Sequence, residues 1–219
     1  MDLPVFYDFA KDWEQMMFLY DSALKQVNTK LDIMTNHFKL TDNYNPVEHI
    51  TSRLKSPESI AKKLSHNQRE ISVANVVKYI NDVAGVRIIC SFESEIYKIA
   101  GLIKKQADIK VIKVKDYIMF PKDNGYSSYH MIVSVPVYMD GLAIDTKVEI
   151  QIRTIAMDFW ASLEHKIYYK FEGNAPASIT KDLKECADIV AFLDRKMMAI
   201  NNEVKTYKVN DKEEVLDVV

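Results

Sequence analysis

Hydrophobic residues recur at steps of three and four along residues 3–39, which is the spacing of one face of an α-helix. We therefore expect a long amphipathic helix there, whose apolar face covers the core or, alternatively, contacts another subunit. A narrower stripe runs from Ile179 to Val204 in alternating steps of four and three. This heptad pattern predicts a helix that packs on another helix, within the subunit or between subunits. Residues 206–219 are expected to be a frayed tail.

The segments between these two helices are shorter, and their patterns change between those of strands and those of helices. Apolar, β-branched or alternating runs predict strands at residues 50–55, 86–92, 109–114, 131–138 and 146–153. Helical patterns lie at residues 57–64, 73–79, 93–106 and 154–171. Asp140 and Gly141 mark a turn between the last two strands.

The last predicted strand separates its side chains into two faces. One is apolar and consists of Thr146, Val148, Ile150 and Ile152, and the other consists of Lys147, Glu149, Gln151 and Arg153. Such a polar face is most often the solvated surface of an antiparallel sheet. The same sheet, however, would also carry Arg53, Lys55, Arg87 and His130. Several cations and a carboxylate that point into one concavity favour a site for a polyphosphate and its metal ion.

A further group of cations lies earlier in the chain. On a strand, Arg53 and Lys55 would share one face, and Ser56, followed by proline, is typical of a helix N-cap. Ser59 and Lys63 would then stand one turn apart on that helix. The free N–H groups and the positive dipole end of a helix start attract phosphate. The alternative is a solvated basic surface beside a well-capped helix, and the spacing alone does not separate the two.

The stretch from Lys113 to His130 is too polar and too rich in turn-forming residues to be core. Pro121 and the Asp-Asn-Gly run at 123–125 indicate a loop between two apolar strands. Loops held between strands often carry binding residues. Asp82, directly before another buried strand, is either a turn residue or a carboxylate directed into a cleft as a metal ligand.

The chain has 219 residues, of which 48% are hydrophobic and 27% charged, and its net charge is −2. Because there is no overall basic field, any anion must be held by a local cluster of cations. Cys90 and Cys186 lie in apolar stretches, so we expect buried free thiols and neither a disulfide nor a metal site. No apolar run reaches the ~18 residues of a membrane span, and the chain does not open on a signal-peptide pattern. We therefore expect a cytoplasmic protein without a membrane partner.

Five motifs follow one another in the middle of the chain. They read R-x-K-x-x-x-S-x-x-x-K from Arg53, N-D-x-A-G-x-R from Asn81, K-D-Y-I-x-x-P-K-x-N-G-Y-x-S-x-H from Lys115, V-E-I-Q-I-R-T from Val148 and W-A-x-x-E-H from Trp160. In this order and spacing, residues 45–172 resemble the small alarmone synthetases, the single-domain branch of the RelA/SpoT-type (p)ppGpp synthetases. The resemblance implies an N-terminal helical arm at 1–44, a catalytic domain at 45–172, and a C-terminal helix for oligomerisation with a tail at 173–219.

The resemblance implies an α+β fold of the nucleotidyltransferase type, with a mixed sheet of about five strands surrounded by helices. The activity it implies is GTP/GDP pyrophosphokinase: the pyrophosphate group of ATP is transferred to the 3′-OH of GDP or GTP, which gives ppGpp or pppGpp and AMP. It implies that Asp82 and Glu149 bind Mg²⁺ and that Glu149 is also the base for the 3′-OH. The residues implied at ATP are Arg53 and Arg87 around the adenine, with Lys55, Ser59 and Lys63 at the phosphates. The residues implied at the acceptor are Tyr126, stacked on guanine, with Lys115, Lys122, Asn124, His130, Gln151 and Arg153.

Three positions depart from the family pattern. Lys113 stands where the long relatives have arginine, which keeps the charge but loses the planar fork, so the preference between GDP and GTP stays open. Tyr129 stands at a position that is usually leucine, and Ser127 at one that is often arginine or glutamine. No His-Asp pair occurs in the sequence. The hydrolase domain of the long relatives contains such a pair, so we expect this chain to synthesise without degrading.

The resemblance further implies a homotetramer assembled through the terminal helices, with a regulatory RNA or (p)ppGpp as further ligands. Two other functions stay open. Some toxic relatives transfer the same group to the 3′ end of tRNA, and a non-catalytic oligomeric regulator would bind nucleotides or RNA. Asp82 and Glu149 together argue against the regulator, because simple binding does not need both carboxylates. The near-neutral net charge argues against RNA as the main partner.

Overall fold

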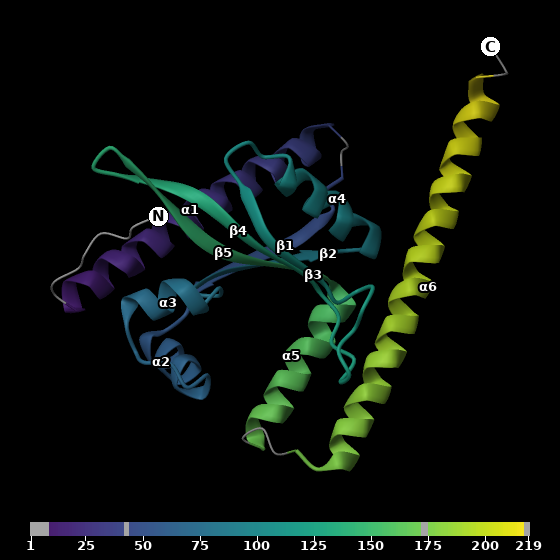
Figure 1. Ribbon diagram of the computed structural model, residues 1–219. Helices are drawn as coiled ribbons and strands as arrows, with labels where there is room; N and C mark the ends of the chain where they lie inside the picture. Colours follow the sequence, from purple (N-terminus) through teal and green to yellow (C-terminus); the bar gives the residue numbers. More distant parts are fainter. Residues whose placement is uncertain (1–8, 42–43, 172–174, 217–219) are drawn as a thin grey trace.

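A five-stranded mixed sheet is the centre of the fold in the computed structural model, which describes residues 9–41, 44–171 and 175–216. The strands are β1 (Val47–Leu54), β2 (Ala84–Cys90), β3 (Lys110–Asp116), β4 (Tyr129–Met139) and β5 (Leu142–Thr154). They lie in the order β1-β2-β5-β4-β3 (Figure 1). The pair β2 and β5 is parallel, and the other three pairs are antiparallel. The mixed five-stranded sheet implied by the resemblance is therefore confirmed.

Six helices surround this sheet in the described ranges. They are α1 (Phe9–Thr41), α2 (Pro57–His66), α3 (Val73–Tyr79), α4 (Glu93–Lys104), α5 (Ile155–Lys170) and α6 (Ala177–Leu216). Helices α1 and α4 pack against one face of the sheet. On the other face, α2 and α3 lie to one side and α5 to the other, and α6 runs beside α5 (Figure 1). This second face of the sheet is therefore flanked by helices on two sides.

Most of the hydrophobic core lies between the sheet and the helices α1 and α4, and buried residues of α2 and α3, such as Leu64 and Val76, belong to the same cluster. Val148, Ile150 and Ile152 of β5 are fully buried in it, together with residues such as Val27 and Leu31 of α1. The two-residue period predicted for β5 is confirmed. Because alternate side chains of a strand point to opposite faces, the polar side chains of β5 must lie on the face turned away from this core.

Two short-range predictions are confirmed in detail. The Ser56 hydroxyl oxygen accepts a hydrogen bond from the Ser59 N–H at 3.3 Å, and Pro57 is the first residue of α2. Asp140 and Gly141, which join β4 to β5, both have positive φ angles, 50° and 79°. Both signals depend on local backbone geometry alone, so the sequence was sufficient to find them.

Several expectations about the C-terminal third were wrong. Residues 206–216 continue α6, where a frayed tail was expected. Cys186 is exposed on α6, although Cys90 is buried as predicted. Leu163 and Phe171, apolar residues of the helical pattern at 154–171, are also exposed. The reason for the exposed positions is that periodicity identifies an apolar face of a helix, but it does not say which neighbouring element covers that face. The predicted helix start at residue 3 lies outside the described residues.

Candidate active site

The polar face of β5 is the centre of the candidate site. Its pairing with β2 places Glu149 beside Gly85 and Gln151 beside Arg87. On the other side, β4 places His130 opposite Gln151. Residues from three separate stretches of the chain therefore meet on the face of the sheet that the core leaves free.

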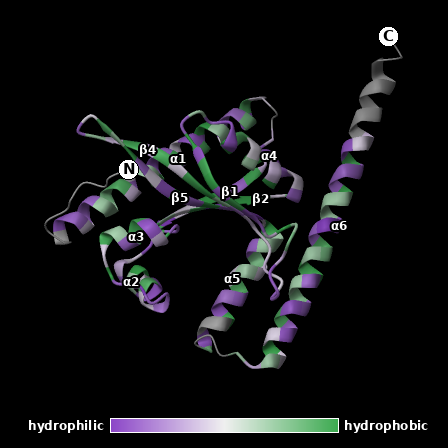
Figure 2. Cartoon of the chain, in the orientation of Figure 1, coloured by the Kyte–Doolittle hydropathy of each residue, from purple (hydrophilic) through white to green (hydrophobic). Residues whose placement is uncertain are grey.

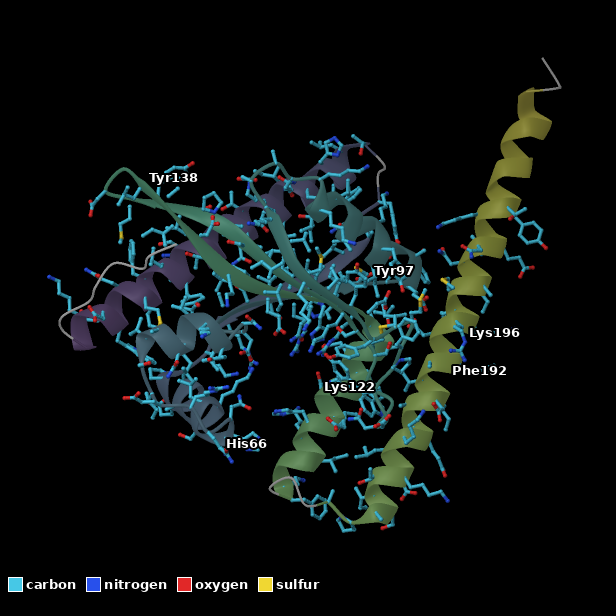
Figure 3. The ribbon with its side chains drawn as sticks, viewed as in Figure 1. His66, Tyr97, Lys122, Tyr138, Phe192 and Lys196 are labelled. Atoms are coloured by element: carbon cyan, nitrogen blue, oxygen red, sulfur yellow. The ribbon has the colours of Figure 1, made fainter. Side chains whose placement is uncertain are left out.

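Two hollows in the surface adjoin at this point. The first is lined by Thr51, Ser52, Arg53, Asp82, Gly85, Val86, Arg87, Glu149 and Gln151. The second is lined by Lys63, Tyr79, Asn81, Asp82, Lys113, Lys115, His130, Ile132 and Glu149. Asp82 and Glu149 line both hollows and therefore lie where the two meet. Figure 3 shows many nitrogen-bearing side chains in this region, below the sheet and between α3 and α5.

Asp82 is held by two lysines from different elements. Its Oδ2 lies 2.7 Å from the Lys55 Nζ, just beyond β1, and its Oδ1 lies 2.7 Å from the Lys63 Nζ on α2. Burial acts to raise the pKa of Asp82, but the hydrogen bonds and charges of the two lysines outweigh it, and the pKa lies below its ordinary value. Asp82 therefore stays ionised through the neutral range, as a metal-binding carboxylate must.

Glu149 belongs to a closed ring of five polar side chains. Gln151 Nε2 donates to Glu149 Oε2 at 2.9 Å, and Arg153 donates to Gln151 Oε1 at 2.9 Å. Arg153 also donates to the Tyr126 hydroxyl at 2.6 Å, and that hydroxyl lies 2.7 Å from His130 Nε2. His130 Nδ1, 3.5 Å from Glu149 Oε1, closes the ring. Because every member contacts two others, the ring fixes the orientation of Glu149.

The surroundings of Glu149 also favour its charged form. Burial acts to raise its pKa, but hydrogen bonds from His130 and Gln151 outweigh this effect, so the pKa lies below its ordinary value. A carboxylate that is ionised and oriented at neutral pH has the properties of a proton acceptor for a hydroxyl group and of a metal ligand.

The loop between β3 and β4 brings predicted acceptor residues to this ring. The rings of Tyr126 and His130 meet edge to face with centroids 5.8 Å apart. The Lys122 Nζ lies 4.7 Å from the centre of the Tyr126 ring, and Figure 3 labels Lys122 close to α5. Asn124 Nδ2 donates to Glu164 Oε1 at 3.1 Å, which ties the loop to α5. Tyr126 is thus held at its hydroxyl by Arg153 and His130, and its ring is contacted by Lys122.

Two side chains have contacts that the sequence did not indicate. Asp158, in the first turn of α5, has Oδ1 3.0 Å from Arg153 NH1 and 3.4 Å from Arg87 NH1. An acidic residue at a helix start is ordinarily explained by the helix dipole, so nothing in the sequence distinguished it. Lys147, which the pattern placed with the polar face of β5, donates to the Val77 carbonyl at the end of α3 at 2.7 Å. Lys147 therefore stabilises a helix end and lines neither hollow.

The structure brings most of the predicted site residues together. Those that line a hollow are Arg53, Asp82, Arg87, Glu149 and Gln151 in the first, and Lys63, Lys115 and His130 in the second, which Asp82 and Glu149 share. Lys55, Tyr126 and Arg153 contact these residues directly. Ser59, Lys122 and Asn124 line neither hollow, and the Ser59 hydroxyl accepts a hydrogen bond from Ser56 at 3.1 Å. The nucleotide contacts implied for these three residues, and for all the other site residues, stay predictions.

Within residues 9–41, 44–171 and 175–216, no helix is both long and apolar enough to cross a membrane.

The same described ranges contain no group of three or more His, Cys, Asp or Glu side chains arranged to hold a metal ion. A metal ion at the two hollows would therefore depend on the two carboxylates of Asp82 and Glu149 and on oxygen atoms of a bound ligand.

Comparison with known proteins extends over both the sheet and the site. Residues 52–174 match the family model of the region found in RelA/SpoT proteins. GTP pyrophosphokinase YwaC of Bacillus subtilis is 48% identical to this chain over 194 residues, which cover 89% of this chain and 92% of that protein.

Two crystal structures from the same organism share the fold. Small alarmone synthetase 2 of Bacillus subtilis has a TM-score of 0.80 at 46% identity, covering 88% of this chain and 99% of that one. Small alarmone synthetase 1, bound to its product pppGpp, has a TM-score of 0.82 at 33% identity, covering 89% of this chain and 98% of that one. With the motifs, the family model and these relatives in agreement, the chain belongs to the RelA/SpoT family, among its small alarmone synthetases.

Proposed function

We propose that the two hollows hold the two nucleotides of (p)ppGpp synthesis, with ATP in the first and the phosphates of GDP or GTP in the second. The observation that carries this proposal is that Asp82 and Glu149 line both hollows. A group passed from one nucleotide to another must cross their meeting point, and there its charge needs to be balanced. Arg53 and Arg87, on the adjacent strands β1 and β2, offer planar guanidinium groups for the adenine of ATP.

In the proposed reaction, the ribose 3′-oxygen of GDP or GTP attacks the β-phosphorus of ATP. A new P–O bond forms, the bond from the β-phosphorus to the oxygen shared with the α-phosphate breaks, and AMP leaves. Glu149 takes the proton of the 3′-OH, because the ring holds its carboxylate ionised and oriented. Lys55 and Lys63 contact Asp82 where the two hollows meet, so they neutralise the pyrophosphate group that passes from ATP to the acceptor.

Asp82 and Glu149 also fit a Mg²⁺ ion, which prefers a few carboxylate oxygens supplemented by substrate oxygens. Both carboxylates are ionised and both reach the junction of the hollows. Lys55 and Lys63 balance the charge of Asp82 in this structure. A divalent ion held by Asp82 would take over this role and would leave the two lysines to contact phosphate. When bound, the ion would neutralise charge on the triphosphate of ATP.

Purified protein with Mg²⁺, γ-labelled ATP and a guanine nucleotide is expected to transfer the label to GDP or GTP, as chromatography of the products would show. Removing divalent ions with EDTA should lower the rate at least about a hundredfold, and added Mg²⁺ should restore it. Parallel reactions with GDP, GTP and deacylated tRNA identify the acceptor. Label found only in tRNA would mean that tRNA, and not a guanine nucleotide, is the acceptor. Bound ATP without any transfer of label would favour a non-catalytic regulator.

We further propose that α6 contacts a second copy of this chain. The start of its heptad stripe is used within the subunit, because Leu183 and Val190 pack against Trp160 of α5. Further along, the stripe residues Leu193, Met197, Ile200 and Val204 are exposed. Figure 2 shows hydrophobic positions that continue along α6 beyond the part beside α5. An apolar heptad stripe fits the same stripe of another copy, which supports the homotetramer implied for the terminal helices.

Met197→Glu should therefore weaken self-association at least about tenfold, because it places a charge in an apolar helix contact. Sedimentation velocity over a range of protein concentrations measures this effect. Leu142→Glu is the matched control, because Leu142 is an exposed apolar residue at the tip of the β4–β5 hairpin. A wild-type protein that stays monomeric at high micromolar concentration would contradict the proposal.

A further inference from the structure

Asp158 is the carboxylate between two arginines that lie on different strands. Its Oδ1 lies 3.0 Å from NH1 of Arg153 on β5 and 3.4 Å from NH1 of Arg87 on β2. Asp158 itself is on α5, so three elements meet at one oxygen atom. Arg153 is nearly fully buried, with a side-chain exposure of 6%. A buried guanidinium of this kind requires a partner of opposite charge.

The two arginines belong to different parts of the active site. Arg87 lines the first hollow together with Arg53, which is the proposed ATP side. Arg153 lines neither hollow, but it donates at 2.6 Å to the hydroxyl of Tyr126, a residue of the proposed acceptor side. It also donates at 2.9 Å to Gln151, which lines the first hollow. Asp158 is therefore in contact with both nucleotide sides at once.

The charges make this contact necessary. Burial and the positive charge of Arg153 lower the pKa of Arg87, whereas the negative charge of Asp158 raises it. The Nε of Arg87 is buried without a hydrogen-bond partner, so the contact of NH1 with Asp158 matters for the orientation of this guanidinium. Without the carboxylate between them, two like charges would repel each other. The position of Arg87 thus depends on that of Arg153 through Asp158.

We propose that Asp158 is a positioning residue that couples the ATP side of the active site to the acceptor side. A nucleotide that orders Arg87 also orders Asp158, which holds Arg153 and with it the hydroxyl of Tyr126. Each nucleotide therefore prepares the site for the other and binds more tightly when the other is present. This coupling rests on the proposed placement of the two nucleotides. By linkage, it must have the same size in both directions.

Isothermal titration calorimetry with a non-hydrolysable ATP analogue, with and without GDP, measures the coupling directly. We expect wild-type protein to bind the analogue about fivefold or more tightly when GDP is present, and GDP to show the same factor with the analogue present. Asp158→Asn keeps the size of the side chain and removes its charge, and it should reduce the factor to below about twofold. Asp158→Glu, which restores the charge, should recover part of it. Asp145→Asn, a surface change on β5, is the control and should keep the wild-type factor.

The measurement needs binding and no turnover, so its outcome is independent of the transfer assay. Failure of wild-type protein to transfer label would overturn the proposed function and leave the coupling measurable. Independent binding of the two nucleotides to wild-type protein would overturn the coupling, even if Asp158→Asn failed to fold. An unchanged coupling factor in a folded Asp158→Asn protein, checked by circular dichroism, would also overturn it.

Discussion

Glu149→Gln is expected to abolish transfer of the pyrophosphate group while ATP binding stays within about tenfold of wild type. The amide cannot accept the proton of the 3′-OH, and it is a poorer ligand for Mg²⁺ than a carboxylate. Loss of a positioned general base alone lowers rates by roughly a hundredfold to ten-thousandfold. The ATP side keeps Arg53, Arg87 and Lys55, so binding should be largely retained. Single-turnover assays with labelled ATP, next to calorimetric titration of an ATP analogue, separate the two effects.

The control for this variant is Asp145→Asn, which makes the same carboxylate-to-amide change on the same strand at an exposed position. It should keep turnover within about twofold, because surface substitutions away from a site have small effects. Glu149→Gln protein that turns over at the wild-type rate would exclude Glu149 as the base. A variant that lost ATP binding and turnover together would instead mean that Glu149 acts mainly in assembling the donor side.

The second large effect is expected at Gly125. This glycine lies in the loop between β3 and β4 that carries Tyr126, here called the acceptor loop. Its φ angle is +88°, and a Cβ added there would lie 2.4 Å from the Ala187 Cβ on α6. Gly125→Ala therefore combines left-handed backbone strain of about 1–2 kcal/mol with overpacking of about 1–3 kcal/mol. We expect the loop to leave α6 and to displace the neighbouring Tyr126 ring. The KM for GDP or GTP should rise at least about tenfold, while the affinity for an ATP analogue stays within about threefold.

Gly141→Ala is a matched control, because Gly141 has a similar φ angle of +79° and open space around its Cβ position. It introduces the backbone strain without the steric clash and lies at the hairpin tip, so the KM for the acceptor should not change. Adding Ala187→Gly to the Gly125→Ala protein removes the clashing methyl group and should recover part of the lost affinity. If Gly125→Ala and Gly141→Ala had equal effects on the KM for the acceptor, contact with α6 would not be what positions the loop.

The parts of this protein that could be predicted from sequence depend on short-range geometry. The alternation of β5 required only the two-residue period of a strand, and the start of α2 only the pair Ser56 and Pro57. The motifs around Asp82 and Glu149 also contain many of the charged residues that line the two hollows, because charged side chains are unusual next to buried strands. For these features, a residue and its near neighbours contain the necessary information.

What the sequence did not show is which of these side chains would be partners. Lys147 and Glu149 are two residues apart on the same face of β5, yet Lys147 caps α3 and Glu149 joins the ring. Asp158 has the sequence context of an ordinary helix start, and only the position of α5 places it between two arginines.

The sequence by itself determined most of the strands and helices, the chemistry of the polar residues and the family. The tertiary structure decided how they combine, through the sheet order β1-β2-β5-β4-β3 and the docking of α6 against the acceptor loop. The physical reason is that periodicity and capping are set by neighbours a few residues apart, whereas the central parallel pair of β2 and β5 joins segments more than fifty residues apart. Contacts over that distance depend on the packing of the whole core, which no local pattern contains.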